Sequence, residues 1–170
     1  MRKIKLPYKV LIVVLILLVG ILLYSAPYSV SEKDILSYIE NDLNMENGSI
    51  KVEAKSQNGK LGAILFKDKR DSSKFNLAII EKGINNKFMI DIWKDIDTFT
   101  TYHENTLFGG HIIEAGNNKD GKISYIIIES EDGEHLRKID VKKGYFVNVF
   151  KLNKSELYNF YNINEEVIEH

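Results

Sequence analysis

Histidine is the residue type in this 170-residue chain best suited to binding a metal, but the four histidines are widely spaced. They lie at positions 103, 111, 135 and 170, without the short intervals that zinc ligands on one loop or helix share. His111 and Glu114 are three apart on an expected strand, so their side chains should point to opposite faces. We therefore interpret His111 as a buried or half-buried histidine with a backbone partner, and we predict no metal site.

Three aspartates, Asp91, Asp95 and Asp97, form the best group of carboxylates for metal binding or for acid and base catalysis. Asp91 falls within an expected strand, however, and the other two follow the exit of that strand. Catalytic acids and bases must converge on the group whose proton they transfer. We therefore interpret the three aspartates as the solvated end of a strand.

The stretch GNNKDG at residues 116–121 resembles a calcium-binding loop. Such a loop needs glycine at its sixth position and acidic ligands at its first and twelfth positions. With Gly121 at the sixth position, Gly116 and Ile127 occupy the first and twelfth, so both essential carboxylates are missing. We predict a hairpin turn here, and the pairs Asp132-Gly133 and Lys143-Gly144 predict two more.

Motifs for covalent catalysis and for phosphate binding are missing from the sequence. It has no cysteine, no Gly-x-Ser-x-Gly, no Ser-x-x-Lys and no glycine-rich phosphate loop. The sequence therefore singles out no catalytic, cofactor-binding or metal-binding residue, and we expect no cofactor. An enzyme whose site has no known motif stays open as an alternative.

A long apolar run near the N-terminus predicts a membrane anchor. Residues 10–23 include no polar side chain, and residues 24–26 extend the run to about 17 residues, close to the length that crosses a ~30 Å hydrocarbon layer. Basic residues precede it at positions 2, 3, 5 and 9, so the positive-inside rule places the N-terminus in the cytoplasm. We predict a cytoplasmic tail at 1–9, a single-pass transmembrane anchor at 10–26, a spacer at 27–30 and an extracytoplasmic domain at 31–170.

The same run also fits a cleavable signal peptide, which has a basic start and a shorter apolar region. Cleavage requires small residues one and three places before the cut. For a cut after Ala26, the third place is the bulky Tyr24, and Pro27 follows the cut directly. We favour the uncleaved anchor and keep the cleaved signal as the alternative.

The composition after the apolar run limits the partners of the domain. Residues 27–170 are enough for one domain with a real core. Four of the 23 Lys and Arg residues precede the run, so 19 remain against all 24 Asp and Glu residues, a charge of about −5 without basic clusters. This charge argues against nucleic acid and against anionic lipid headgroups as partners. Because there is no cysteine, burial alone must stabilise the domain.

Hydrophobic periodicity predicts an α+β fold. An amphipathic helix is expected at residues 31–43, opened by a Ser31-x-x-Asp34 capping box. Its apolar stripe consists of Ile35, Leu36, Ile39 and Leu43. The period then changes to two, and about eight antiparallel strands are expected, at 49–55, 61–67, 75–80, 88–93, 111–115, 123–129, 135–141 and 145–152. A short C-terminal helix is expected at residues 155–162, where Leu157, Phe160 and Tyr161 share one side.

Matching segments predict that the strands form two duplicated four-stranded meanders, at about residues 49–93 and 110–152. For example, NGKL at residues 58–61 matches DGKI at residues 120–123, and several such matches share nearly the same offset. Val52 and Ile113 are then expected in equivalent buried positions, with Glu53 and Glu114 on the solvent face. The alternative is that any two meanders share strand alternation and glycine turns.

The second set of strands also carries a resemblance to a group of bacterial domains. The strings GHIIEAGNNKDGKISYIIIES and KKGYFVNVFKL resemble membrane-anchored extracytoplasmic domains of Gram-positive bacteria that have no known function. The shared pattern is an apolar strand, a Gly-Asn turn, a Lys-Ile strand and a Phe-rich closing strand, within residues 107–152. The resemblance implies a location and a class, but no activity and no site residue.

These features favour a binding role over catalysis. We predict a membrane-tethered extracytoplasmic binding or interaction module of the bacterial cell envelope, acting on a protein or an envelope component. The alternatives are an envelope hydrolase with an unrecognised site, and an accessory or sensor subunit of a membrane complex. Membrane lipid is the expected partner of residues 10–26, and no nucleic acid is expected.

Overall fold

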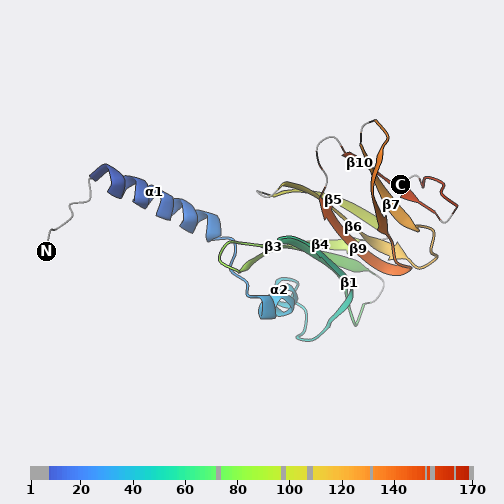
Figure 1. The fold of residues 1–170 in the computed structure, drawn as a ribbon. Helices are drawn as coiled ribbons and strands as arrows, with labels where there is room; N and C mark the ends of the chain where they lie inside the picture. Colours follow the sequence, from blue (N-terminus) through green and yellow to red (C-terminus); the bar gives the residue numbers. More distant parts are fainter. Residues whose placement is uncertain are drawn as a thin grey trace.

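The computed structural model describes residues 8–71, 74–96, 99–106, 109–130, 132–151, 153, 156–162 and 164–168. Over these residues the chain has the predicted α+β fold, with helices first and antiparallel strands after them. The helices are α1 (Tyr8–Ser25), the short 3₁₀ helix η1 (Glu32–Asp34) and α2 (Ile35–Asp42). Figure 1 shows α1 projecting away from the strands.

Within the described residues, ten strands form three antiparallel sheets. The first sheet has the order β1-β2-β3-β4 and consists of β1 (Ile50–Asn58), β2 (Leu61–Asp68), β3 (Phe75–Lys82) and β4 (Phe88–Ile96). The middle sheet has the order β5-β6-β9 and consists of β5 (Phe99–Thr106), β6 (Gly109–Asn118) and β9 (Gly144–Lys151). The outer sheet has the order β10-β7-β8 and consists of β7 (Tyr125–Ser130), β8 (His135–Asp140) and β10 (Glu156–Tyr161).

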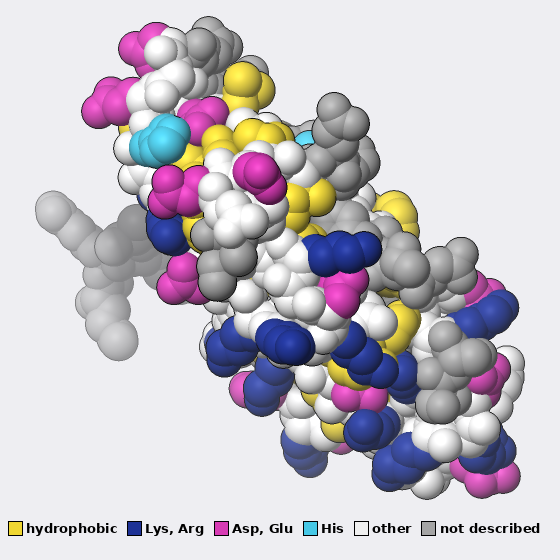
Figure 2. All heavy atoms as spheres, turned by 90° about the vertical axis from the view of Figure 1, so that its right-hand side faces the viewer, with side chains coloured by type: hydrophobic (Ala, Val, Ile, Leu, Met, Phe, Trp, Pro, Cys, Tyr) yellow, Lys and Arg dark blue, Asp and Glu magenta, His cyan; other side chains and the backbone are white. Residues whose placement is uncertain are grey.

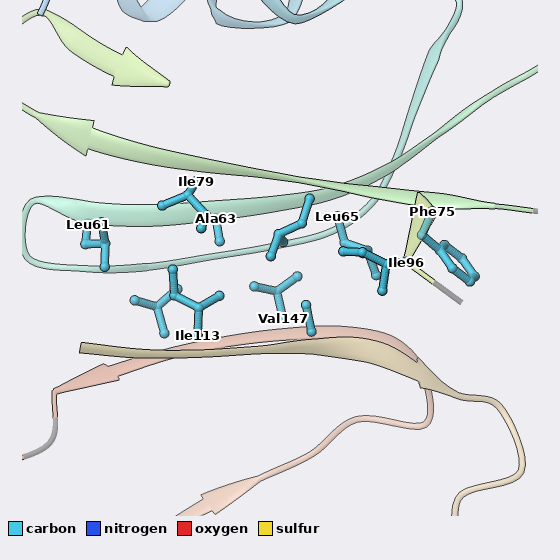
Figure 3. Packing of buried hydrophobic residues seen from close by; sticks show 11 residues of the cluster. Leu61, Ala63, Leu65, Phe75, Ile79, Ile96, Ile113 and Val147 are labelled. Carbon is cyan, nitrogen blue, oxygen red and sulfur yellow. The ribbon is translucent and has the colours of Figure 1, made fainter. Parts of the chain in front are cut away.

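The three sheets are stacked, so the middle sheet is covered on both faces (Figure 1). The first core lies between the first and middle sheets (Figure 3) and includes Leu61, Ala63, Leu65, Leu77, Ile79, Ile113, Ala115, Val147 and Val149. The second core lies between the middle and outer sheets and includes Ile112, Ile126, Ile128, Phe146, Phe150 and Phe160. Successive residues of β6 and β9 therefore pack into different cores, as strands buried on both faces require.

The helix α2 covers the other face of the first sheet. Ile39 is fully buried there and packs with Ile50, Phe66 and Ala78. Leu36, which belongs to the predicted apolar stripe, is exposed. The Ser31 hydroxyl donates to the Asp34 carboxylate and caps no backbone N–H group. The helical segment is thus confirmed, whereas the predicted capping box is wrong.

The helix α1 includes all but the last residue of the predicted anchor at residues 10–26. Its apolar side chains at positions 10–19, 21 and 22 are exposed, and the helix points away from the sheets (Figure 1). Residues 1–7 of the predicted basic tail lie outside the described part of the chain. No helix among the described residues combines the length and the apolarity that a membrane crossing demands.

Two strands occupy segments for which the sequence predicts other structures. Residues 99–106, for which the sequence predicts no strand, form β5, which pairs with β6. Residues 156–161, expected to be helical, form β10, which pairs with β7. Tyr158 and Phe160 pack into the second core while Leu157 is 58% exposed, so burial alternates with a period of two. The predicted C-terminal helix is wrong because this segment pairs with the edge of β7, which would otherwise be open.

Only the first set of strands forms the predicted four-stranded meander, so the two sets are not equivalent. There, β1 to β4 pair in sequence order. In the second set β6 pairs with β9, and the intervening β7–β8 hairpin folds over into the outer sheet. This arrangement covers the second apolar face of β6 and β9, which a flat meander would leave in water.

The three predicted hairpin turns have different outcomes. Asp132-Gly133 does join two paired strands, and Gly133 has a positive φ of 84° that suits glycine. The turns at Gly121 and Gly144 connect the middle sheet with the outer sheet, so neither is a hairpin. Residues 116–118 are therefore the end of β6, and residues 119–124 are a crossover between layers.

Val52 and Ile113 do not have equivalent environments. A register shift between Val52 and Ala54 interrupts β1, and Val52 is 39% exposed, whereas Ile113 is fully buried. Glu114, expected in solvent, is also fully buried, because the outer sheet covers its face of β6. The prediction of a solvent face is therefore wrong for Glu114.

Candidate functional site

A cationic pocket lies where β1 and β2 meet the crossover turn that follows β6. Its volume is about 540 Å³, and its lining, which we call the lysine pocket, consists of Lys51, Glu53, Lys67, Asp68, Lys69, Lys119 and Tyr145. The four lysines come from three separate parts of the sequence. The fold therefore gathers a basic cluster that the linear sequence does not show.

Strand pairing and one buried amide position these lysines. Lys51 on β1 is the register partner of Lys67 on β2, so their side chains share one face. Lys119 sits on the crossover turn, which the buried side chain of Asn118 holds in place. The Asn118 amide donates to the Ile123 carbonyl at 2.7 Å and accepts from the Ile123 N–H at 3.0 Å.

Lys67 forms the floor of the lysine pocket. It is only 7% exposed, and its ammonium lies 4.3 Å from the centre of the Phe75 ring and 4.6 Å from that of Tyr145. It also donates a 2.9 Å hydrogen bond to the Tyr145 hydroxyl. Buried ammonium groups need such compensation, and aromatic faces provide part of it. The positive charge is thus fixed at the boundary between the first core and the pocket.

Tyr145 links this floor to the crossover turn. Its ring packs edge-on against Phe75, with 4.8 Å between centroids, and the ammonium of Lys119 lies 4.8 Å from its ring centre. Burial acts to raise the pKa of the Tyr145 hydroxyl, but hydrogen bonds from Lys119 and Lys67 outweigh it and lower this pKa below the usual value. A hydroxyl polarised in this way is a good hydrogen-bond donor to an anion.

The ion pairs around the lysine pocket leave it with excess positive charge. Four ammonium groups line it against the carboxylates of Glu53 and Asp68. Glu53 pairs with Lys51 at 3.1 Å, and Asp68 pairs with Arg70 at 3.3 Å, outside the lining. Figure 2 shows, from one side, Lys and Arg side chains gathered over the lower half of the molecule. A negatively charged ligand therefore fits this pocket best.

The described histidines, which the sequence analysis considered as metal ligands, do not lie together in one site. His103 on β5 is exposed, and His135 pairs with Glu129 at 3.0 Å. His111 is buried, as predicted, and His170 lies outside the described residues. In the described part of the chain, no group of three His, Cys, Asp or Glu residues could hold a metal ion.

The three aspartates at the end of β4 also act separately. The carboxylate of Asp91 accepts a 3.1 Å hydrogen bond from the Trp93 indole. Asp95 pairs with Lys74 at 3.2 Å, and Asp97 lies outside the described residues. Asp91 and Asp95 are both exposed, as predicted, but β4 continues to Ile96, so Asp95 lies within the strand and does not follow it.

Glu114 is a buried ionisable residue that sequence reasoning missed. Its two carboxyl oxygens accept hydrogen bonds from the Thr101 hydroxyl at 3.1 and 2.9 Å, beneath Tyr158 of the outer sheet. Burial raises the pKa of Glu114 to about 8, against the lowering effect of hydrogen bonds from Thr101 and Tyr158. Glu114 is fully buried among the described residues, so we assign it no ligand.

The lysine pocket was missed as well, although part of its signal lies in the sequence. Lys67 continues the buried series Leu61, Ala63 and Leu65 at the period of a strand, which marks it as an inward-facing lysine. Tyr145 and Lys119 join it only through the stacking of the sheets. No family model, curated protein or solved structure matches this chain. The chemistry of the pocket is therefore the main guide to its function.

Proposed function

We propose that this protein is a membrane-tethered extracytoplasmic module that binds an anionic component of the cell envelope in its lysine pocket. The observation that carries the proposal is the set of four lysines around a cavity of about 540 Å³, with both lining carboxylates already paired to cations. A cavity of this size suits a small molecule or a short segment of a polymer.

Phosphate and carboxylate groups are the chemistry that such a pocket favours. Lysine ammonium groups act as point charges and bind phosphate without requiring a fixed orientation. Lys67 and Tyr145 are already held by packing, so little ordering is needed when a ligand binds. Lys69 and Lys119 are exposed and can approach the ligand from the rim.

The tether is the helix α1. Its 18 residues extend over about 27 Å, and its apolar side chains are exposed. A hydrocarbon layer of ~30 Å can thin locally around a slightly short helix at modest cost. Four basic residues in the first nine favour a cytoplasmic N-terminus, which leaves the lysine pocket outside the cell.

The binding test uses the full-length chain in mild detergent with pyrophosphate and citrate as probes, titrated by calorimetry. We expect binding of at least one probe that weakens as salt increases, because screening reduces the attraction between charges. Lys69→Ala and Lys119→Ala should each weaken binding about tenfold, the effect of one charged hydrogen bond.

The matched control is Lys94→Ala, which removes an exposed lysine outside the pocket lining and should leave the affinity unchanged. Glucose, which has no charge, should not bind. If neither anion binds, or if Lys94→Ala weakens binding as much as Lys119→Ala, the lysine pocket is not the binding site.

A further inference from the structure

We propose that the β3–β4 turn is a membrane-contact surface that binds anionic lipid headgroups. The turn comprises residues 83–87, with Ile84 at its tip and Lys82 and Lys87 at its two ends. The proposal rests on the membrane insertion of α1 proposed above. It adds a fixed orientation of the domain against the lipid surface.

The segment that follows α1 packs directly against this turn. Tyr28 is buried with its ring against Gly83, so closely that an added Cβ at Gly83 would lie 2.6 Å from the Tyr28 Cγ. The Asn85 side-chain amide donates a 3.0 Å hydrogen bond to the Tyr28 carbonyl. Any side chain larger than that of glycine at position 83 would therefore displace the Tyr28 ring from the turn.

A second contact follows two residues later. The Val30 N–H donates to the Phe88 carbonyl at 3.2 Å, and the Phe88 N–H donates to the Val30 carbonyl at 2.8 Å. The Tyr28 N–H also donates to the carbonyl of Ser25, the last residue of α1, at 3.1 Å. The connection is therefore short and hydrogen-bonded, and Figure 1 shows the end of α1 beside the β3–β4 turn.

The side chains on this turn fit the interface of a bilayer. Ile84 is 52% exposed although it is large and apolar. Lys87 is exposed, and the ammonium of Lys82 lies 5.8 Å from the centre of the Phe88 ring. Apolar residues flanked by lysine bind lipid surfaces through burial at the headgroup level and attraction to lipid phosphates.

The backbone of the turn is ordered, so its residues are presented in a fixed way. The Gly83 N–H donates to the Lys87 carbonyl at 2.8 Å, and the Asn85 side chain accepts from the Lys87 N–H at 3.0 Å. Asn86 has a positive φ of 57°, a conformation that asparagine tolerates. The membrane thus meets a preformed tip continuous with the anchor helix.

The test takes advantage of the absence of cysteine from the sequence. Ile84→Cys in the full-length chain is spin-labelled and reconstituted into vesicles that contain phosphatidylglycerol. We expect the label to be more accessible to dissolved oxygen than to a water-soluble nickel complex, the signature of immersion in lipid. The control is Leu157→Cys, an exposed apolar position on the outer sheet, whose label should be fully aqueous.

Charge reversal tests the role of the lysines. The double substitution Lys82→Glu and Lys87→Glu should move the Ile84→Cys label toward water in phosphatidylglycerol vesicles. With both lysines kept, replacing these vesicles by vesicles of phosphatidylcholine alone should also move the label toward water. If the chain floats with the vesicles but the Ile84→Cys label is aqueous, the membrane-contact surface is refuted while the anchor stands. A chain that does not float with vesicles at all refutes the anchor and this surface with it.

Discussion

Glu114 and Lys67 are charged residues on strand faces that the fold buries, but their surroundings differ. Lys67 reaches the edge of the first core, where two aromatic rings and a hydroxyl compensate its charge. Glu114 lies between the middle and outer sheets, where hydroxyl groups surround it. The burial of Glu114 favours the neutral acid, whereas the side chain of Lys67 lies at the floor of the lysine pocket.

Stability should therefore fall with rising pH because of Glu114. A glutamate in the unfolded chain titrates near 4.5, whereas burial raises the pKa of folded Glu114 to about 8. Between these values the unfolded chain releases its proton first, so the free energy of unfolding decreases with pH and levels off above about pH 8. The loss should be on the order of a few kcal/mol.

The measurement is urea unfolding of the full-length chain in detergent across this pH range. Glu114→Gln should remove most of the pH dependence, since an amide stays neutral. Glu134→Gln, at an exposed site, should retain it. A wild-type profile that coincides with that of Glu114→Gln would contradict the raised pKa.

At the scale of the elements, the predicted strands are the part of the fold that sequence reasoning recovers best. All eight overlap observed strands, because their apolar residues alternate or run together between clear turn residues. The strand β10 was missed because Leu157, Phe160 and Tyr161 also fit one side of a helix. Its partner β7 decides between the two patterns, and pairing between distant strands is not encoded in local spacing.

Alanine substitutions in β10 distinguish the strand from the predicted helix. Phe160→Ala removes a fully buried ring from the second core and should lower the free energy of unfolding by about 3–5 kcal/mol. Leu157→Ala alters an exposed side chain and should change it by less than about 0.5 kcal/mol. Urea midpoints of both variants provide the comparison, and similar losses at the two positions would favour a helix that buries them together.

At the scale of the whole molecule, the layered order separates the proposed functions. The helix α1, which we propose as the anchor, and the β3–β4 turn lie at one end of the molecule, and the outer sheet lies at the opposite end (Figure 1). The lysine pocket lies between these ends and is lined by residues of β1, β2, β9, the crossover turn and Lys69 directly after β2. The sequence reasoning that found no basic cluster was limited to neighbours along the chain, whereas this pocket depends on stacking.

The orientation of the molecule can be measured on intact cells. The basic residues before α1 predict that added protease removes a C-terminal epitope tag and spares an N-terminal one. In permeabilised cells both tags should be lost, which controls for protease access. Protection of the C-terminal tag in intact cells would reverse the proposed topology and place the lysine pocket inside the cell.

The position of β9 in the middle sheet has a consequence for the timing of folding during synthesis. This strand supplies Val147 and Val149 to the first core and Phe146 and Phe150 to the second. Neither core can close before residues 144–151 have emerged from the ribosome or from an export channel. A chain delivered from its N-terminus can therefore complete neither core until residues 144–151 have passed, and the second core also waits for Phe160 of β10.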